Sequence, residues 1–186
     1  LSSYVAHGYD SDDHDCLRED GSVATPKQIR LSAPGAVGAG SAKYADAATA
    51  SNGQVVFAPH EADAVGVWDA NASTFQSVSI GSTVGGAQKF HGAAAVGHSH
   101  VVFAPHDASG VGVYKAESST FDYFPTSATA SGSAKYAGAA WAPDHGVVVF
   151  APHNADSVGV WHVSTQTFSS FDNQSIIIGA SKFMGA

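Results

Sequence analysis

Short apolar runs alternate with turn residues along most of the chain. In the segment 44–80 these runs cover 44–50, 54–59, 65–68 and 75–80, and Asn52-Gly53 separates the first two. Asn-Gly between two apolar runs is a strong hairpin signal. Runs this short, rich in Val and broken by Gly or Pro, do not have the length or period of helices. The pattern predicts four antiparallel strands joined as a meander.

The same pattern recurs along the chain. The sequence Val-Val-Phe-Ala-Pro-His at 55–60 returns at 101–106 and 148–153, at offsets of 46 and 47 residues. The extra residue of the last copy falls in a turn around Pro143. A lysine recurs at the same offsets, at Lys43, Lys89, Lys135 and Lys182. Tandem four-stranded units of this size are typical of β-propeller blades.

The repeat arithmetic predicts an all-β fold with four blades in a single domain, 1–186. Three blades cover 43–88, 89–134 and 135–180, and the chain ends with the first strand of a fourth, 181–186. Counting back from Lys43 places Ile29 in a fourth strand, and His7 ends a shortened second strand. We therefore expect 1–42 and 181–186 to share one blade and to close a four-bladed ring, because closure removes unpaired sheet edges.

Glycine lies beside a large aromatic residue in the third run of each clear copy. Gly66, Gly112 and Gly159 occupy this position, next to Val-Trp or Val-Tyr. We expect the missing side chain to allow one sheet to approach the next. The tryptophans are interpreted as packing between blades, with stacking on a sugar as the alternative.

The composition of the chain limits the classes of partner that it can bind. The chain is 44% hydrophobic and only 13% charged, with a formal net charge of -8. This sign argues against binding nucleic acid. No apolar run approaches the roughly 20 residues of a membrane helix. Cys16 is the single cysteine, which excludes an internal disulfide, and Leu1 instead of Met suggests a processed chain or a fragment.

The unit 43–70 resembles a β-propeller repeat abundant in unicellular algae, akin to the YVTN and NHL repeats. The shared features are Lys-Tyr, Asn-Gly, a Pro after the second run and Val-Gly-Val-Trp-Asp. Asp46 replaces the usual glycine, which Gly92, Gly138 and Gly185 keep, and His replaces the tyrosine that usually follows the Pro. The resemblance implies an architecture, since such propellers include lyases, ligand binders, scaffolds and subunits of large assemblies.

One face of the predicted propeller gathers repeated polar residues. Strand one begins, and strand two ends, on the same side of an antiparallel blade. The candidate ligand-binding residues are Lys43, His60, Lys89, His106, Lys135, His153, Lys182 and His7. They could bind an anion, a metal or a carbonyl compound. The structural alternative, which we favour, is that each Lys bonds a neighbouring blade and each His caps its own turn.

No catalytic residue is assigned, and no cofactor is predicted. A metal held by all four repeated histidines is disfavoured, because strand two is removed from the axis and a metal–nitrogen bond measures about 2.0 to 2.1 Å. The other histidines are interpreted as surface or turn residues. They are His91, His98, His100, His145 and His162.

An acidic segment interrupts the repeat near the N-terminus. Its alternating carboxylates suggest a metal loop at Asp10, Asp12 and His14, but the glycine and the distal glutamate of an EF-hand are absent. A solvated loop is favoured. As the largest departure from the repeat, the segment offers Asp12, Asp13 and Asp15 as contacts for a specific partner.

These observations favour a non-enzymatic propeller that acts as a scaffold or accessory subunit and binds a protein partner. By resemblance alone, one version is a peripheral subunit of an organellar photosynthetic membrane complex. The alternatives are a small-molecule binder or metal-assisted lyase or hydrolase using the Lys/His face, and a carbohydrate-binding lectin. The sequence does not fix the compartment; a chloroplast location or secretion after removal of a targeting segment would both fit.

Overall fold

The structure is a computed structural model that describes residues 40–126, 129–172 and 179–186. The chain divides into two units, 1–30 and 31–186, and every described residue belongs to the second. The first sheet contains β1 (Tyr44–Thr49), β2 (Gln54–Pro59), β3 (Ala64–Asp69) and β4 (Thr74–Ser79). The second contains β5 (Phe90–Val96), β6 (His100–Pro105), β7 (Gly110–Lys115) and β8 (Thr120–Pro125). The third contains β9 (Tyr136–Ala142), β10 (Val147–Pro152), β11 (Ser157–His162) and β12 (Thr167–Asp172).

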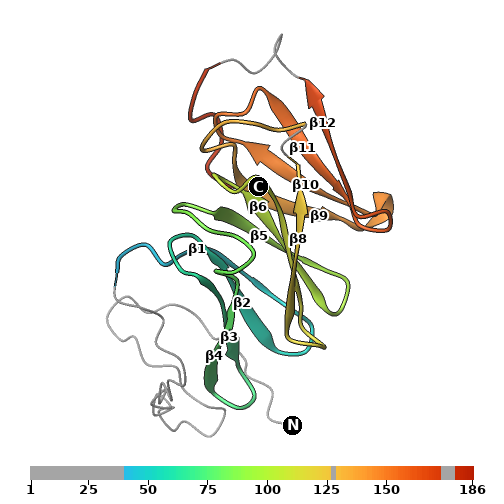
Figure 1. Ribbon diagram of the computed structural model, residues 1–186. Coiled ribbons are helices and arrows are strands. Elements are labelled where there is room, and N and C mark those ends of the chain that lie inside the picture. Colours follow the sequence, from blue (N-terminus) through green and yellow to red (C-terminus); the bar gives the residue numbers. More distant parts are fainter. Residues whose placement is uncertain (1–39, 127–128, 173–178) are drawn as a thin grey trace, which may run out of the picture. The chain divides into compact units, whose positions relative to one another are not determined.

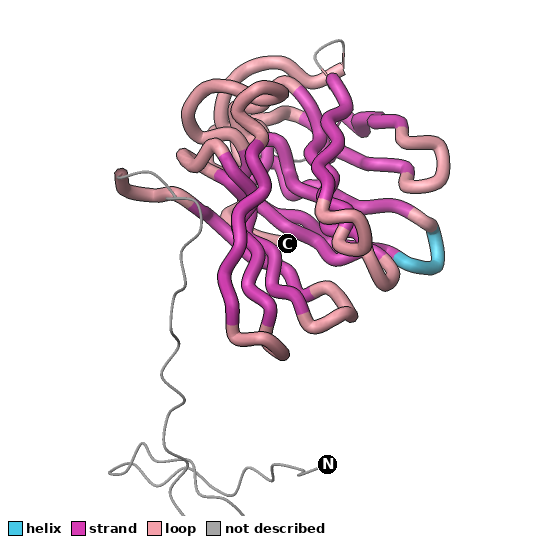
Figure 2. Tube along the Cα trace, turned by 60° about the horizontal axis from the view of Figure 1, so that its bottom comes forward, coloured by secondary structure: helices cyan, strands magenta, loops and turns pink. Residues whose placement is uncertain are grey.

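Each sheet is an antiparallel meander whose strands pair in chain order. The innermost strands stack on one another, with β5 between β1 and β9 (Figure 1). The predicted four-stranded repeat is therefore confirmed. The turn with the extra residue forms a short 3-10 helix, η1 (Pro143–His145), which is the helical turn visible among the described residues in Figure 2.

The innermost strands approach closely where glycine replaces a side chain. A Cβ on Gly92 would lie 2.7 Å from backbone atoms of Gly138, and a Cβ on Gly138 would lie 2.4 Å from the backbone nitrogen of Ala186. Asp46, which stands where these glycines would be, instead joins two sheets: its Oδ2 accepts a hydrogen bond from the backbone N–H of Ala93 at 3.0 Å.

An aromatic triad recurs in every sheet. Phe90, Phe103 and Phe121 form it in the second sheet, with ring centroids 5.7 to 6.5 Å apart. The corresponding triads are Tyr44–Phe57–Phe75 and Tyr136–Phe150–Phe168.

The third-strand glycines serve these triads, which corrects their predicted role. A Cβ on Gly112 would lie 2.8 Å from the ring of Phe121 and 2.9 Å from that of Phe90, both in its own sheet. Gly66 and Gly159 have the same surroundings. The missing side chain therefore makes room for rings within a sheet, not for the neighbouring sheet.

Burial shows which sheet faces are covered by described residues. Val101 and Phe103 of the second sheet are fully buried, whereas Val55 and Phe57, at the same positions of the first, are half-buried. On the opposite face of the sheets, the third sheet is the less buried one: Ala104 of the second sheet is fully buried, whereas Ala151, at the same position of the third, is half-buried. Sheet faces that meet another described sheet are sealed, and the two outward faces are not.

The described residues form three sheets, and no four-bladed ring and no closure are seen among them. The expected first strand at 181–186 is not formed, because no described strand offers it a hydrogen-bonding partner. The other strands expected for that blade fall in 1–42, of which 1–39 lie outside the described residues. Within the described part of the chain there is no helix long and apolar enough to cross a membrane.

Candidate functional site

The repeated Lys and His residues are joined by a continuous series of backbone hydrogen bonds. Within each sheet the N–H of His60, His106 or His153 donates to the carbonyl of Lys43, Lys89 or Lys135, at 2.8 to 3.0 Å. Between sheets the N–H of the next lysine donates to the histidine carbonyl, from Lys89 to His60 at 2.9 Å and from Lys135 to His106 at 3.0 Å. The structure therefore brings these residues, from Lys43 to Lys182, together at one end of the sheets.

The ammonium groups of Lys89, Lys135 and Lys182 each bond the loop that precedes the lysine. The ammonium group of Lys89 donates to the carbonyl of Gly86 at 2.7 Å, and that of Lys135 to the carbonyl of Gly132 at 3.1 Å. Both glycines have positive φ, 94° and 95°, which side chains other than hydrogen disfavour. The Lys182 ammonium bonds Gly179 in the same way.

The two central lysines are inaccessible. Lys89 is 0% exposed and Lys135 2% exposed. The ammonium group of Lys89 reaches Asp63 of the preceding sheet at 3.2 Å, and that of Lys135 donates to the His106 carbonyl at 2.8 Å. Burial lowers the pKa of Lys135, and the carboxylate of Asp107 opposes this shift. Both ammonium groups therefore tie adjacent sheets together, and neither is directed at solvent.

Four imidazole rings gather beside these lysines, and we call them the histidine cluster: His60, His91, His106 and His153. The rings of His60, His91 and His106 form a triangle with centroids 5.3 to 5.6 Å apart, and His153 lies 5.9 Å from His106. His106 is 7% exposed and the other three are half-buried.

Sequence reasoning missed His91, which was expected at the surface or in a turn. In β5, Phe90 pairs with Pro105 and Gly92 with Ala104, so His91 is the unpaired residue of a bulge. Bulges commonly redirect a side chain near functional sites. The available signal was the position of His91 immediately after the aromatic residue that begins a first strand. The alternation of apolar and polar residues did not reveal the bulge.

Hydrogen bonds fix the tautomers of two rings. Nδ1 of His60 lies 3.1 Å from the carbonyl oxygen of Phe90, and Nδ1 of His91 lies 3.1 Å from that of Ala137. A carbonyl can only accept, so Nδ1 of each ring carries a proton.

The central ring, His106, is held neutral. Its Nδ1 lies 3.4 Å from Oδ1 of Asp107 but makes no hydrogen bond, and the buried Nδ1 of His153 also lacks a described partner. Burial lowers the pKa of His106, as do the neighbouring His91, His60 and His153, while Asp107 opposes them. The cluster is therefore a partly buried group of four imidazoles whose central ring is uncharged.

Metal binding has no preformed geometry in the described part of the chain. No group of three or more His, Cys, Asp or Glu side chains there is arranged to hold a metal ion. His7, the suggested metal residues Asp10, Asp12 and His14, and the suggested partner contacts Asp12, Asp13 and Asp15 lie outside the described residues.

Comparisons with known proteins identify the fold and nothing finer. No protein family matches the sequence, and no curated protein does. Among solved structures, virginiamycin B lyase from Staphylococcus aureus matches at TM-score 0.59 and 13% identity, over 84% of this chain and 47% of that one. The WD40 repeats of RRP9 match at TM-score 0.57 and 10% identity, over 74% and 41%. Hydrazine synthase from Kuenenia stuttgartiensis matches at TM-score 0.53 and 10% identity, over 70% and 35%.

These likenesses place the chain among β-propeller repeat proteins by fold. The chain spans less than half the length of each of these structures. At identities this low the fold is shared but function is not implied. The narrower resemblance to an algal-type repeat stays a prediction.

Proposed function

We propose that this chain is a non-enzymatic β-propeller scaffold that binds a protein partner. The observation that carries the proposal is the burial of the two central lysines, Lys89 and Lys135, whose ammonium groups bond Asp63 and the His106 carbonyl of the preceding sheet. A reactive or ligand-binding lysine has to reach its substrate, and these do not. WD40 repeats are among the structural neighbours, which supports an interaction role by fold.

The partner surface we propose is the end that carries the histidine cluster. Ring nitrogens of the cluster can form hydrogen bonds with a partner, and the neutral His106 does so without the desolvation cost of a charge. Glu61, Asp63 and Asp156 are exposed in the turns that follow the second strands, and the last two pair with Lys89 and Lys182. This combination of ring nitrogens and acids fits a protein surface that presents hydrogen-bond donors.

As part of the same proposal, the scaffold is a four-bladed ring in which 181–186 and 1–42 supply the fourth blade. The support is that Lys182 donates its backbone N–H to the His153 carbonyl at 3.0 Å, as the first strands of the second and third sheets do at their lysines. Phe183 occupies the position of the fully buried Phe90 and Tyr136 but is 43% exposed. Strands two to four of another blade would cover it.

Size-exclusion chromatography of an extract from the source cells, followed by immunodetection, tests the interaction. We expect the wild-type protein to elute in a larger assembly, and the triple variant His60→Ala, His106→Ala, His153→Ala to elute at its own mass. The matched control is His145→Ala with His162→Ala, two histidines outside the cluster, which should leave the assembly intact.

Two results would contradict the scaffold. One is elution of the wild-type protein at its own mass in the extract. The other is catalytic turnover or a bound small molecule at the histidine cluster that the triple variant loses, since this would make the cluster a chemical site.

A further inference from the structure

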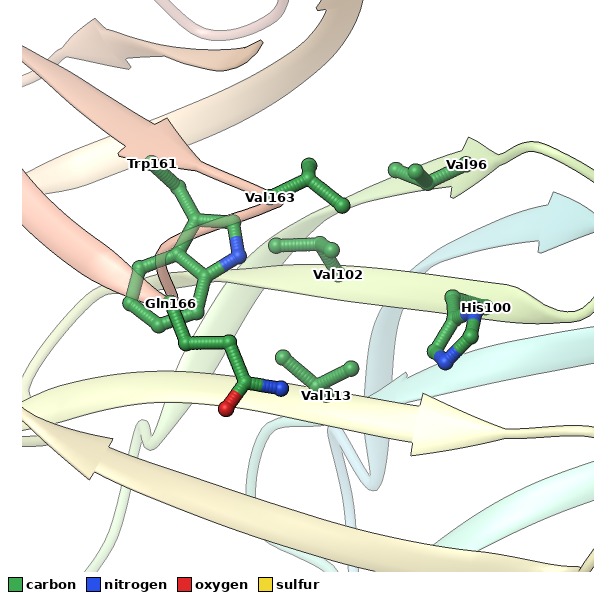
Figure 3. Close-up of a pocket in the computed structure, with 7 residues that line it drawn as sticks. All are labelled: Val96, His100, Val102, Val113, Trp161, Val163 and Gln166. Carbon is green, nitrogen blue, oxygen red and sulfur yellow. The ribbon is translucent and has the colours of Figure 1, made fainter. Parts of the chain in front are cut away.

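A pocket of about 220 Å³ lies between the second and third sheets, at the opposite end of β6 from the histidine cluster (Figure 3). It is lined by Val96, His100, Val102, Val113, Trp161, Val163 and Gln166. Neither the repeated lysines nor the histidine cluster contributes to it.

The pocket has an apolar, buried interior and a polar mouth. Val96, Val102, Val113 and Trp161 are each 1 to 6% exposed. His100 is half-buried, with Nδ1 3.2 Å from the Ser99 hydroxyl, and Gln166 is exposed. Sites of this kind, with apolar walls and a few directed polar groups, suit small apolar ligands.

Trp161 places a hydrogen-bond donor on the wall of the pocket. Its indole packs on Phe124 of β8, with ring centroids 4.9 Å apart, and this contact fixes the ring plane. The residue is 2% exposed, and its Nε1 faces the pocket in Figure 3. An acceptor inside the pocket can therefore receive a hydrogen bond from this N–H.

Most of the residues that line the pocket differ from those at the same positions of the other junction between sheets. At the junction of the first and second sheets, the positions of Trp161, Val163 and Val96 hold Tyr114, Ala116 and Ala50, all buried in one apolar cluster. Two of the seven positions keep the same residue in both junctions, as Val56 and Val67 match Val102 and Val113. Residues that every blade needs are repeated, whereas those of the pocket are mostly particular to one junction.

We propose that this pocket binds a small, uncharged, planar aromatic molecule that carries one hydrogen-bond acceptor, such as an aryl carbonyl. The valines pack against the ring, Trp161 Nε1 donates to the acceptor, and His100 and Gln166 border the opening. This activity is separate from the proposed scaffold, because the pocket and the histidine cluster lie at opposite ends of β6.

Titration of the nitrogen-15-labelled protein with acetophenone tests the proposal. We expect a saturable shift of one indole N–H signal in the proton–nitrogen correlation spectrum, namely the signal that Trp161→Phe removes. The indole signals of Trp68 and Trp141 serve as internal controls and should stay in place. Absence of a saturable Trp161 shift at the solubility limit of acetophenone would overturn the proposal.

Two comparisons separate a specific site from general apolar contact. Ethylbenzene, which has the same size but no acceptor, should bind about fivefold more weakly, the ratio expected for one hydrogen bond of about 1 kcal/mol. Val163→Phe should fill the pocket and abolish the shift, while Val163→Ala retains it, with thermal unfolding as the check on folding. Equal affinity for the two probes would overturn the assigned role of Trp161, even if Val163→Phe failed to fold.

Discussion

The backbone N–H of Lys182 donates to the carbonyl of His153 at 3.0 Å, the same bond that joins Lys135 to His106 in the preceding junction. The ammonium group of Lys182 also lies 3.6 Å from Asp156, as that of Lys89 lies 3.2 Å from Asp63. The C-terminal segment thus holds the position of a first strand without being paired as one.

Deletion of 182–186 is therefore expected to destabilise the protein, by about 1 to 3 kcal/mol. It removes the bond to His153, the buried lysine contacts and the backbone packed against Gly138. Urea unfolding followed by circular dichroism measures the change. Deletion of 185–186 alone is the control for chain shortening and should cost less; equal stability of the wild type and the longer deletion would show that the segment does not dock.

Lys135→Met should be among the most damaging single changes at this end of the sheets. The methionine keeps the apolar stem but removes the ammonium bonds to the buried carbonyls of His106 and Gly132, so that the His106 carbonyl keeps only the bond from the backbone N–H of residue 135. The expected loss is about 2 to 3 kcal/mol in the free energy of unfolding. Lys115→Met, which breaks a partly exposed pair with Asp122, is the matched control and should cost about 1 kcal/mol or less. Similar losses for the two variants would contradict the role of the Lys135 ammonium group in joining adjacent sheets.

Gly92→Ala tests the close approach of the innermost strands. The new Cβ would lie 2.7 Å from the backbone of Gly138, so β5 and β9 would have to separate. Overpacking of this kind costs about 1 to 3 kcal/mol. Gly85→Ala, where no atom lies within 4 Å of the added Cβ, should be close to neutral. Both can be compared by thermal unfolding, and an unchanged midpoint for Gly92→Ala would contradict the stacking.

The sequence predicted the strands well because apolar runs and turn residues alternate along each repeat. Apolar runs end at Asn52-Gly53 or at Pro143, and the structure places turns at both positions. The lysines were correctly placed at one end, but their burial depends on the loop that wraps each ammonium group. A glycine with positive φ stands three residues before each lysine, but this spacing alone did not show that the ammonium group folds back onto the loop.

His91 and the pocket could not be predicted for a related reason. A bulge changes which way one side chain points without changing the apolar pattern around it. The pocket depends on Trp161 of the third sheet packing against Phe124 of the second, a contact between residues 37 positions apart in the sequence. The pocket arises from packing between repeats, whereas the repeat pattern describes each unit by itself.

Stability should fall between neutral and mildly acidic pH, in part because of His106. Its pKa is lowered in the folded protein by burial, whereas in the unfolded chain it is about 6.5. The unfolded state therefore takes up a proton first, and the stabilising difference present above pH 6.5 is lost as the pH falls through the folded-state pKa. His106→Gln should show a smaller fall in thermal midpoint from pH 7.5 to 5. Parallel profiles for wild type and variant would contradict this assignment.

Phe183→Ala, compared with Phe90→Ala, distinguishes a closed fourth blade from an open end. Phe90 is fully buried between Phe103 and Phe121, so its truncation should cost about 3 to 5 kcal/mol. Phe183 is 43% exposed, and with its described neighbours alone the same change should cost about 1 kcal/mol or less. A fourth blade would bury Phe183 in a triad of its own and raise its cost toward that of Phe90. Urea unfolding of the two variants in the full chain gives the comparison; a small loss at Phe183 beside a large loss at Phe90 would contradict the ring.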